Sequence, residues 1–148
     1  GGVQGIRLKK GDAVTSMDVV EKDGSLLVVT SGGFGKQTPL KEYSPKGRAT
    51  GGIATIDNKA LKEIGKIVSA RVVQQDDDLT IMTANGQTIR IKNKTVKTAG
   101  RATKGVHLIK PQEGDYVASV ARISAEDMKK AGASMMDEEK SEPQQQLM

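Results

Sequence analysis

The stretch that decides the fold is GRATGGIATI, at residues 47–56, because the chain repeats it almost unchanged as GRATKGVHLI at residues 100–109. The two copies begin 53 residues apart. Two further pairs of segments align at this offset, namely VTSMDVV (14–20) with IVSARVV (67–73) and LLVVTSGG (26–33) with LTIMTANG (79–86). The sequence therefore contains an internal repeat of about 50 residues.

Short apolar segments bounded by turn residues recur through the repeat, which predicts strands rather than long helices. Hairpin turns are expected at KDGS (22–25) and ANGQ (84–87), because Gly and Asn accept the positive φ of tight turns. The segment NKALKEIG (58–65) is inserted only in the second copy, and we expect a loop or one helical turn there. The expected strands are residues 5–9, 14–20, 26–30, 36–43, 52–56, 66–73, 79–83, 87–92, 105–109 and 116–123.

About four strands fit into each period, and antiparallel repeats of this length are typical of propeller blades. We therefore expect an all-β fold of propeller-like (β-pinwheel) blades in residues 1–123, with two repeats and the start of a third. This is fewer than a closed ring requires, so the ring is expected to be incomplete. A short helix is predicted at residues 124–133, where Ser124 and Asp127 form a capping-box pattern, and residues 134–148 are predicted to be a disordered acidic tail.

The charge is distributed unevenly along the chain. The net charge is +5, but residues 124–148 carry six acidic residues and three lysines, which leaves +8 on residues 1–123. A basic body suggests a polyanionic partner, although many basic domains bind no polyanion.

Composition also limits the classes of protein that remain. The absence of cysteine excludes disulfides and thiolate metal sites, and it fits a reducing cytoplasm. No signal peptide is expected from the sequence, and no apolar run approaches the ~20 residues of a membrane span, so no membrane partner is expected. Because the chain starts with Gly and enters its first repeat partway through, we expect it to be a segment of a longer protein.

Residue constellations typical of enzymes are hard to find. The single histidine, His107, is expected to lie on a strand face, and Asp76–Asp78 are expected to form a solvated turn. GGFGKQT (32–38) looks like a phosphate loop, but it lacks the first glycine and the final Ser or Thr of that motif. Tyr43 and Tyr116 lack a supporting set of acid-base residues, so a nucleophilic role is not expected for either. We therefore predict no catalytic residue, metal site or cofactor site in this chain.

The basic residues follow the repeat more closely. Arg48 and Arg101 occupy the same position in the two copies, and the Gly and Thr beside them allow a nucleic-acid backbone to approach closely. The alternative is that these residues are ordinary solvent-facing residues of strands. The candidate DNA-binding residues are Arg7, Lys36, Arg48, Arg90, Lys92, Lys94, Arg101 and Lys104.

Three stretches resemble the carboxy-terminal domain of the DNA gyrase A protein, and the resemblance covers residues 3–123. They are GIRLKKGDAV, TSGGFGKQTPLKEYSPKGRATGGI and GRATKGVHLI. The run from Gly33 to Thr50 is similar to the family pattern NGYGKRTPxxEYxxxGRxxxG. It departs from that pattern at Gly32, Phe34 and Gln37, where the family has Asn, Tyr and Arg.

The resemblance implies the last blades of a six-bladed β-pinwheel whose rim wraps double-stranded DNA without sequence preference. It implies a non-catalytic part of an ATP-hydrolysing type II topoisomerase, whose ATP and magnesium sites lie elsewhere. It also implies the gyrase A core and the gyrase B protein as partners in an A2B2 heterotetramer, in the cytoplasm and associated with the nucleoid.

Two other interpretations stay open. The glutamine-arginine-glycine box of the family's first blade is absent, so the corresponding A protein of topoisomerase IV remains an alternative; the two GRAT copies and the acidic tail favour gyrase. A propeller-type protein-interaction scaffold, without salt-dependent affinity for DNA, is the second.

Overall fold

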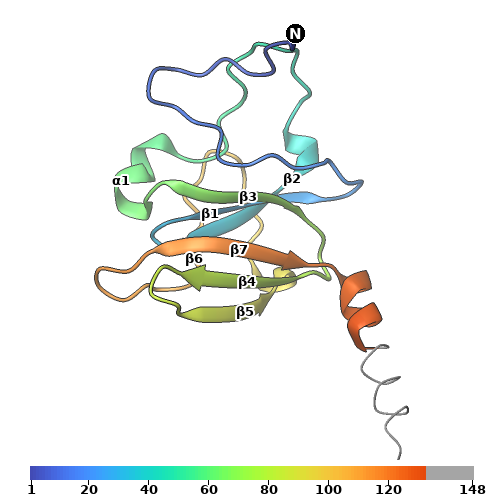
Figure 1. Ribbon diagram of the computed structural model, residues 1–148, viewed down its shortest axis with the longest axis vertical. Coiled ribbons are helices and arrows are strands. Elements are labelled where there is room, and N and C mark those ends of the chain that lie inside the picture. The colour runs from blue at the N-terminus through green and yellow to red at the C-terminus, as the bar shows by residue number, and fades with distance from the viewer. Residues whose placement is uncertain (133–148) are drawn as a thin grey trace, which may run out of the picture.

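The computed structural model describes residues 1–132, and two antiparallel sheets form its body (Figure 1). The first sheet has the strand order β3-β1-β2-β6 and the second has the order β5-β4-β7. The strands are β1 (Ser25–Thr30), β2 (Phe34–Pro39), β3 (Ile67–Val73), β4 (Asp78–Thr83), β5 (Thr88–Lys92), β6 (Val106–His107) and β7 (Val117–Ile123). The short helical elements are η1 (Leu40–Glu42), η2 (Asn58–Ala60), α1 (Leu61–Ile64) and η3 (Asn93–Thr95).

The two sheets repeat the same backbone plan. In each, a hairpin (β1–β2 or β4–β5) is joined on one side by the next long strand of the chain, β3 or β7. The pairing slips at the same place in both sheets, between Val29 and Thr30 in β1 and between Met82 and Thr83 in β4. The repeat predicted from the sequence is therefore confirmed at the level of strand register, and the fold class is the predicted blade-like β fold.

An aliphatic core lies between the two sheets. It is formed by buried residues of both sheets and of the segments that follow η3 and β6, which are Leu27, Val29, Val73, Leu79, Ile81, Val96, Ile109, Val117 and Val120. A second cluster packs α1 against the other face of β1 through Val28, Phe34 and Ile64. The strand β1 is therefore buried on both faces, as expected of the middle layer of a stack, and branched aliphatic residues suit this position.

The insert between the repeats forms η2 followed by α1, one turn each. The carboxylate of Asp57 accepts a hydrogen bond from the backbone N–H of Lys59 at 3.0 Å, which caps the first turn. Gly65 ends α1 with φ of 83°, a conformation that favours glycine. The loop or single helical turn predicted for residues 58–65 is therefore confirmed.

Several predicted strands are absent or shorter. Residues 52–56 form no strand, and in residues 5–9 only Ile6 makes a bridge, to Thr50. The strand predicted over residues 36–43 ends at Pro39, which has no N–H to donate, and η1 follows it.

The prediction that residues 14–20 form a strand equivalent to residues 67–73 is wrong. The segment runs beside β3, but side chains make the contacts: Ser16 Oγ donates to Ala70 O at 3.0 Å, and the Asp18 carboxylate accepts from Val72 N at 2.9 Å. The strands β3 and β7 each pair with the hairpin that precedes them, and residues 1–13 form no hairpin. The apolar side chains of the segment, Val14, Met17, Val19 and Val20, are exposed.

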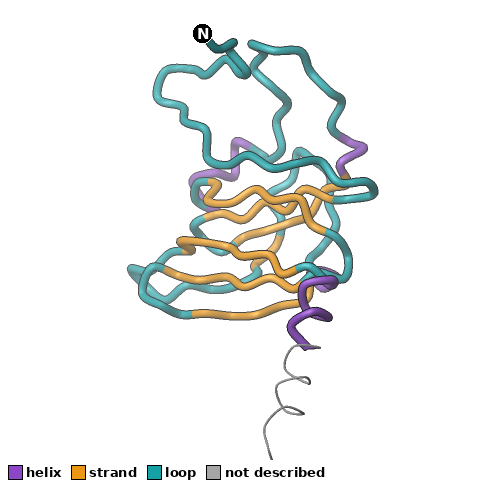
Figure 2. The backbone as a smooth tube through the Cα atoms, turned by 45° about the vertical axis from the view of Figure 1, so that its right-hand side comes forward, coloured by secondary structure: helices purple, strands orange, loops and turns teal. Residues whose placement is uncertain are grey.

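Two loop regions extend beyond the first sheet on the side away from β5. Figure 2 shows them as teal tube above the strands, and they belong to residues 1–22 and 43–57. At the other end of the chain, residues 125–132 form a helix that Ser124 caps, because its Oγ accepts from Asp127 N at 3.1 Å. The acidic tail predicted at residues 134–148 lies outside the described residues. No helix in residues 1–132 has the length and apolar character needed to cross a membrane.

Candidate nucleic-acid interface

The two GRAT segments, residues 47–50 and 100–103, form turns with the same internal hydrogen bond. We call them the first turn and the second turn. Thr50 Oγ1 donates to Gly47 O at 3.1 Å, and Thr103 Oγ1 donates to Gly100 O at 2.9 Å. Such hydroxyl-to-backbone contacts are typical of tight turns that contain Thr. The identical sequence therefore produces the same local hydrogen bond twice.

Backbone from earlier in the chain supports each turn at its threonine. The carbonyl oxygen of Thr50 accepts from Arg7 N at 2.9 Å, and that of Thr103 accepts from Asp57 N at 3.3 Å. The glycines after the turns, Gly52 and Gly105, have φ of 78° and 79°. A Cβ at Gly105 would lie 2.5 Å from Gly35 O, so glycine is required there for close packing as well.

The arginines of the two turns are displayed differently. Arg48 is exposed, whereas Arg101 is half-buried and its Nη1 lies 3.5 Å from Ala54 O. Among residues 1–132, no carboxylate forms an ion pair with either guanidinium. Both charges are therefore available to an anion, and Arg101 has the more restricted side chain.

Lys36 is buried, which corrects its predicted place on the DNA-facing surface. Only 1% of the residue is exposed, and its Nζ donates to Gly100 O at 2.7 Å, Arg101 O at 2.6 Å and Thr103 Oγ1 at 3.1 Å. Three acceptors match the three protons of an ammonium group. Lys36 thus contacts the second turn from inside the protein, and it leaves the set of candidate phosphate ligands.

The β5 side of the second sheet carries three of the predicted residues. Arg90 keeps 58% of its side chain exposed and forms an ion pair with Asp78 at 2.7 Å. Lys92 and Lys94 are exposed, and with Asp76, Asp78 and other residues they line a shallow groove beside β5. This surface has mixed charge, so its attraction for DNA is weaker than the number of its basic residues suggests.

The last two predicted residues lie beside the turns. Lys104 follows the second turn, pairs with Glu63 at 2.8 Å and lies 6.0 Å from the centre of the Phe34 ring. Arg7 is exposed and, as its backbone contact shows, lies against the first turn.

The eight predicted residues therefore separate into three groups. Arg7 and Arg48 are at the first turn; Lys36, Arg101 and Lys104 are at the second; Arg90, Lys92 and Lys94 are on the β5 side. The first turn lies in the loop region near the N-terminus, and β5 lies at the opposite end of the body (Figure 1). The described basic residues are spread along the molecule rather than gathered in one patch.

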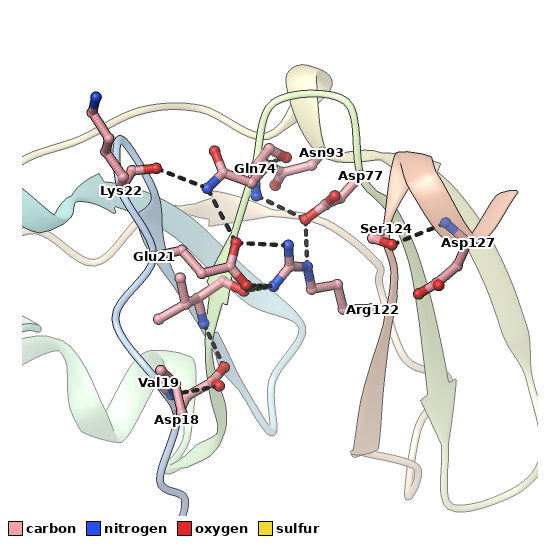
Figure 3. Close-up of polar contacts among 11 residues, drawn as sticks. Asp18, Val19, Glu21, Lys22, Gln74, Asp77, Asn93, Arg122, Ser124 and Asp127 are labelled. Carbon is pink, nitrogen blue, oxygen red and sulfur yellow. Dashed lines mark hydrogen bonds and ion pairs between the residues drawn. The ribbon is translucent and has the colours of Figure 1, made fainter. Parts of the chain in front are cut away.

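Sequence reasoning missed an ionic cluster that joins three distant parts of the chain (Figure 3). Arg122 on β7 donates to Glu21 at 2.6 Å, to Asp77 at 2.5 Å and to Val72 O at 2.9 Å. Asp77 is only 2% exposed and Asp78 is half-buried in β4, so the solvated turn predicted at residues 76–78 is confirmed only at Asp76. The same oxygen, Asp77 Oδ2, also accepts from Gln74 N at 2.7 Å, and this bond closes the turn between β3 and β4.

These surroundings change the proton affinity of several groups. The hydrogen bond from Arg122 is the main reason that the pKa of Glu21 is lowered, and a contact from Gln74 adds to it. Burial lowers the pKa of Lys36, and the charge of Glu42 opposes this effect. Hydrogen bonds lower the pKa of Asp115, and the bond with Thr83 makes the largest contribution.

Within the described residues, no group of three or more His, Cys, Asp or Glu side chains could hold a metal ion. His107 lies on β6, is exposed, and packs against Phe34 with 3.9 Å between ring centres. The exposed basic side chains described above are suited to binding an anion through their positive charge.

Two successive sheets with one register, one hairpin plan and one repeated turn define a propeller-type repeat protein. Comparison with known families agrees: the DNA gyrase C-terminal domain, beta-propeller, matches residues 1–21, 24–74 and 77–124. The chain belongs to this family.

Relatives and solved structures support the assignment. The chain is 43% identical over 126 residues to the DNA gyrase A protein of Mycolicibacterium smegmatis, which covers 85% of the chain and 15% of the relative. It is 38% identical over 128 residues to the DNA gyrase A protein of Staphylococcus epidermidis. This match covers 85% of the chain and 14% of the relative. The chain thus spans about one seventh of the length of these relatives.

Two solved structures have the same fold. The C-terminal domain of DNA topoisomerase IV superposes with a TM-score of 0.79 at 28% identity, covering 93% of this chain and 43% of that one. A DNA gyrase A C-terminal domain superposes with a TM-score of 0.77 at 25% identity, covering 83% and 41%.

Proposed function

We propose that this chain binds double-stranded DNA through the phosphate backbone, without preference for sequence, as a non-catalytic part of DNA gyrase. The observation that carries the proposal is that each repeat displays an arginine, Arg48 or Arg101, on the same type of turn and without a carboxylate partner among the described residues. Membership of the gyrase C-terminal family supports it.

The physical basis is charge neutralisation along a curved path. Arginine forms forked hydrogen bonds with phosphate oxygens, and these contacts carry no information about the bases. Turns repeated once per blade place such contacts at regular intervals along a rim. Bending stiff DNA around a rim costs several kcal/mol by elastic estimates (about 1–6 kcal/mol for a short site), which many phosphate contacts together offset.

In the complete enzyme, wrapping would set the handedness of the DNA crossing that is presented to the cleavage core. ATP-driven strand passage would then produce negative supercoils. Bond cleavage, the magnesium site and ATP hydrolysis would be supplied by the gyrase A core and the gyrase B protein, in an A2B2 assembly in the cytoplasm at the nucleoid.

The test is to measure the affinity for a mixed-sequence duplex at several salt concentrations. Arg48→Ala and Arg101→Ala should each reduce the slope of log affinity against log salt by roughly 0.9, the value for one released counterion. Lys129→Ala is the control, because it removes one exposed charge from the helix of residues 125–132. Unchanged slopes for both arginine variants would reject the turn arginines as phosphate ligands.

Topoisomerase IV is the second candidate for the parent enzyme. The observation that favours it is the superposition of a topoisomerase IV C-terminal domain on 93% of this chain. An assay of the holoenzyme that contains the chain separates the two. ATP-dependent introduction of negative supercoils into relaxed plasmid supports gyrase, and decatenation without such supercoiling supports topoisomerase IV.

A further inference from the structure

Three consecutive residues of β2 hold the loop that leads into the second turn. Gln37 Nε2 donates to Val96 O at 2.8 Å, Thr38 Oγ1 donates to Ala99 O at 2.7 Å, and Lys36 donates to the turn itself. All three residues are almost fully buried, between 0% and 1% exposed. Polar side chains in the centre of a strand therefore bind backbone carbonyl oxygens of residues about 60 positions later.

Burying an ammonium group is unfavourable unless its protons are all accepted. In the described structure the acceptors of Lys36 are two carbonyl oxygens and one hydroxyl oxygen, and no carboxylate lies within ion-pair distance. The positive charge of Lys36 thus fixes the orientation of two adjacent peptide groups, those that follow Gly100 and Arg101.

That orientation decides what the turn presents on its outer side. In a planar trans peptide, the C=O and N–H bonds point in opposite directions. Because the oxygens of Gly100 and Arg101 point inward to Lys36, the N–H groups of Arg101 and Ala102 point away from it. Within residues 1–132 neither N–H has an acceptor, whereas in the first turn Ala49 N donates to Gly5 O.

In the other copy of the repeat, both the lysine and the turn that it contacts are missing from the described residues. Ile89 on β5 occupies the position that corresponds to Lys36 on β2, 53 residues earlier. Among the described residues, no turn packs over the outer edge of β5. Ile89, whose side chain has no hydrogen-bond donor, therefore lies at a position where no backbone carbonyl oxygen needs one.

We propose that Lys36 is a positioning residue for DNA binding: it turns the carbonyl oxygens of the second turn inward, so that Arg101 and the free N–H groups face a DNA phosphate. This inference rests on the proposed function. Lys36 itself makes no contact with DNA, and it acts through the turn that it holds.

The test combines Lys36→Met and Arg101→Ala in a double-mutant cycle on the full chain, with a mixed-sequence linear duplex as the probe. Lys36→Met should weaken binding at low salt by about fivefold, the upper range for one exposed charged contact. Adding Arg101→Ala to Lys36→Met should then cause little further loss, because the arginine is already misplaced. Ile89→Met is the matched control and should bind as the wild type does.

Hydrogen exchange supplies the readout of positioning. In Lys36→Met, the amides of Ala99 and Asp57, which donate to Gln37 O and Thr103 O, should exchange faster. Those of β1 and β3 should keep their protection, which shows that the fold is intact. If Lys36→Met fails to fold, Thr103→Val takes its place, since it removes one acceptor of the ammonium.

The outcomes separate this inference from the function on which it rests. Faster exchange of the turn with unchanged DNA affinity overturns the positioning role, even when Arg101→Ala still weakens binding. Losses that simply add in the double variant also overturn it, because Lys36 would then affect binding independently of Arg101. If Arg101→Ala alone has no effect, the phosphate contact of the proposed function fails instead.

Discussion

The strands β2 and β5 occupy the same place in the two copies of the repeat, yet their surroundings are opposite. Five of the six residues of β2 are buried, including the polar Lys36, Gln37 and Thr38. In β5, exposed and half-buried residues alternate, and the exposed Arg90 keeps 58% of its side chain accessible to solvent. Equal backbone register therefore does not mean equal burial.

The cause is what lies at the outer edge of each strand. Residues 97–99 run along β2, where Gln37 N donates to Lys97 O at 3.1 Å and Ala99 N donates to Gln37 O at 2.9 Å, and β6 pairs with its other end. Over β5 the described chain places no such segment. The repeat thus sets the path of the backbone, while the neighbouring repeat sets the side chains that each strand requires.

The strongest effect is expected at β7, the counterpart of β3. Arg122 pairs in register with Leu79, as Val72 pairs with Leu26, but only Arg122 neutralises a buried carboxylate. Arg122→Met leaves Asp77 buried without its cation, so we expect the free energy of unfolding to fall by about 3 kcal/mol. Urea denaturation measures the change.

A control for this comparison is Arg71→Met, which removes an exposed arginine from β3. It should change the free energy of unfolding by less than about 0.5 kcal/mol. Similar losses for Arg71→Met and Arg122→Met would show that the ionic cluster of Figure 3 does not hold the two sheets together.

The next effect compares positions of β1 and β4 that match in the repeat. Val29 is 0% exposed, whereas Met82, 53 residues later, is 44% exposed. Val29→Ala should lower the free energy of unfolding by about 2 kcal/mol, through lost transfer energy and the cavity that remains. Met82→Ala should change it by less than about 0.5 kcal/mol. Equal losses in urea denaturation would contradict the sandwiched position of β1.

These pairs of strands also show which parts of the fold the sequence predicts. The repeat with its offset of 53 residues predicts β1, β3, β4 and β5 correctly. These predictions succeed because each of the four strands has a partner strand within the described chain. It fails at residues 14–20, where the apolar pattern is the same but no hairpin in the described chain provides a partner.

The candidate site was predictable only where it depends on local sequence. The two turns follow from their Gly and Thr residues. A lysine is normally solvated, so sequence reasoning places Lys36 on the surface; its burial depends on carbonyl oxygens 64 and 65 residues later in the chain. The contact of Arg122 with Glu21 spans 101 residues. No periodicity in the sequence encodes such distant partners.

A pH dependence gives a second test of the contrast between Arg122 and Val72. The pKa of Glu21 is lowered in the folded state, so its contribution to stability is complete above its unfolded value of 4.5 and is lost as the pH falls through the folded pKa. The free energy of unfolding of the wild type should therefore decrease below about pH 4.5. In Arg122→Met the decrease should be smaller, because Glu21 has lost the main cause of its shift. Parallel pH profiles in urea denaturation would contradict this assignment.

The weakest effect distinguishes the two turns themselves. Thr50 and Thr103 both donate to the glycine carbonyl three residues earlier, but only Thr103 Oγ1 also accepts from Lys36, at 3.1 Å. Thr103→Val leaves one proton of a buried ammonium without an acceptor, and we expect it to lower the free energy of unfolding by about 1 kcal/mol. Thr50→Val removes one exposed hydrogen bond and should cost less than about 0.5 kcal/mol. In a Lys36→Met background the two substitutions should become equivalent, because the ammonium that distinguishes them is gone. If Thr103→Val remains the more destabilising in that background, its extra effect comes from the packing of the second turn against β2 and not from the lysine.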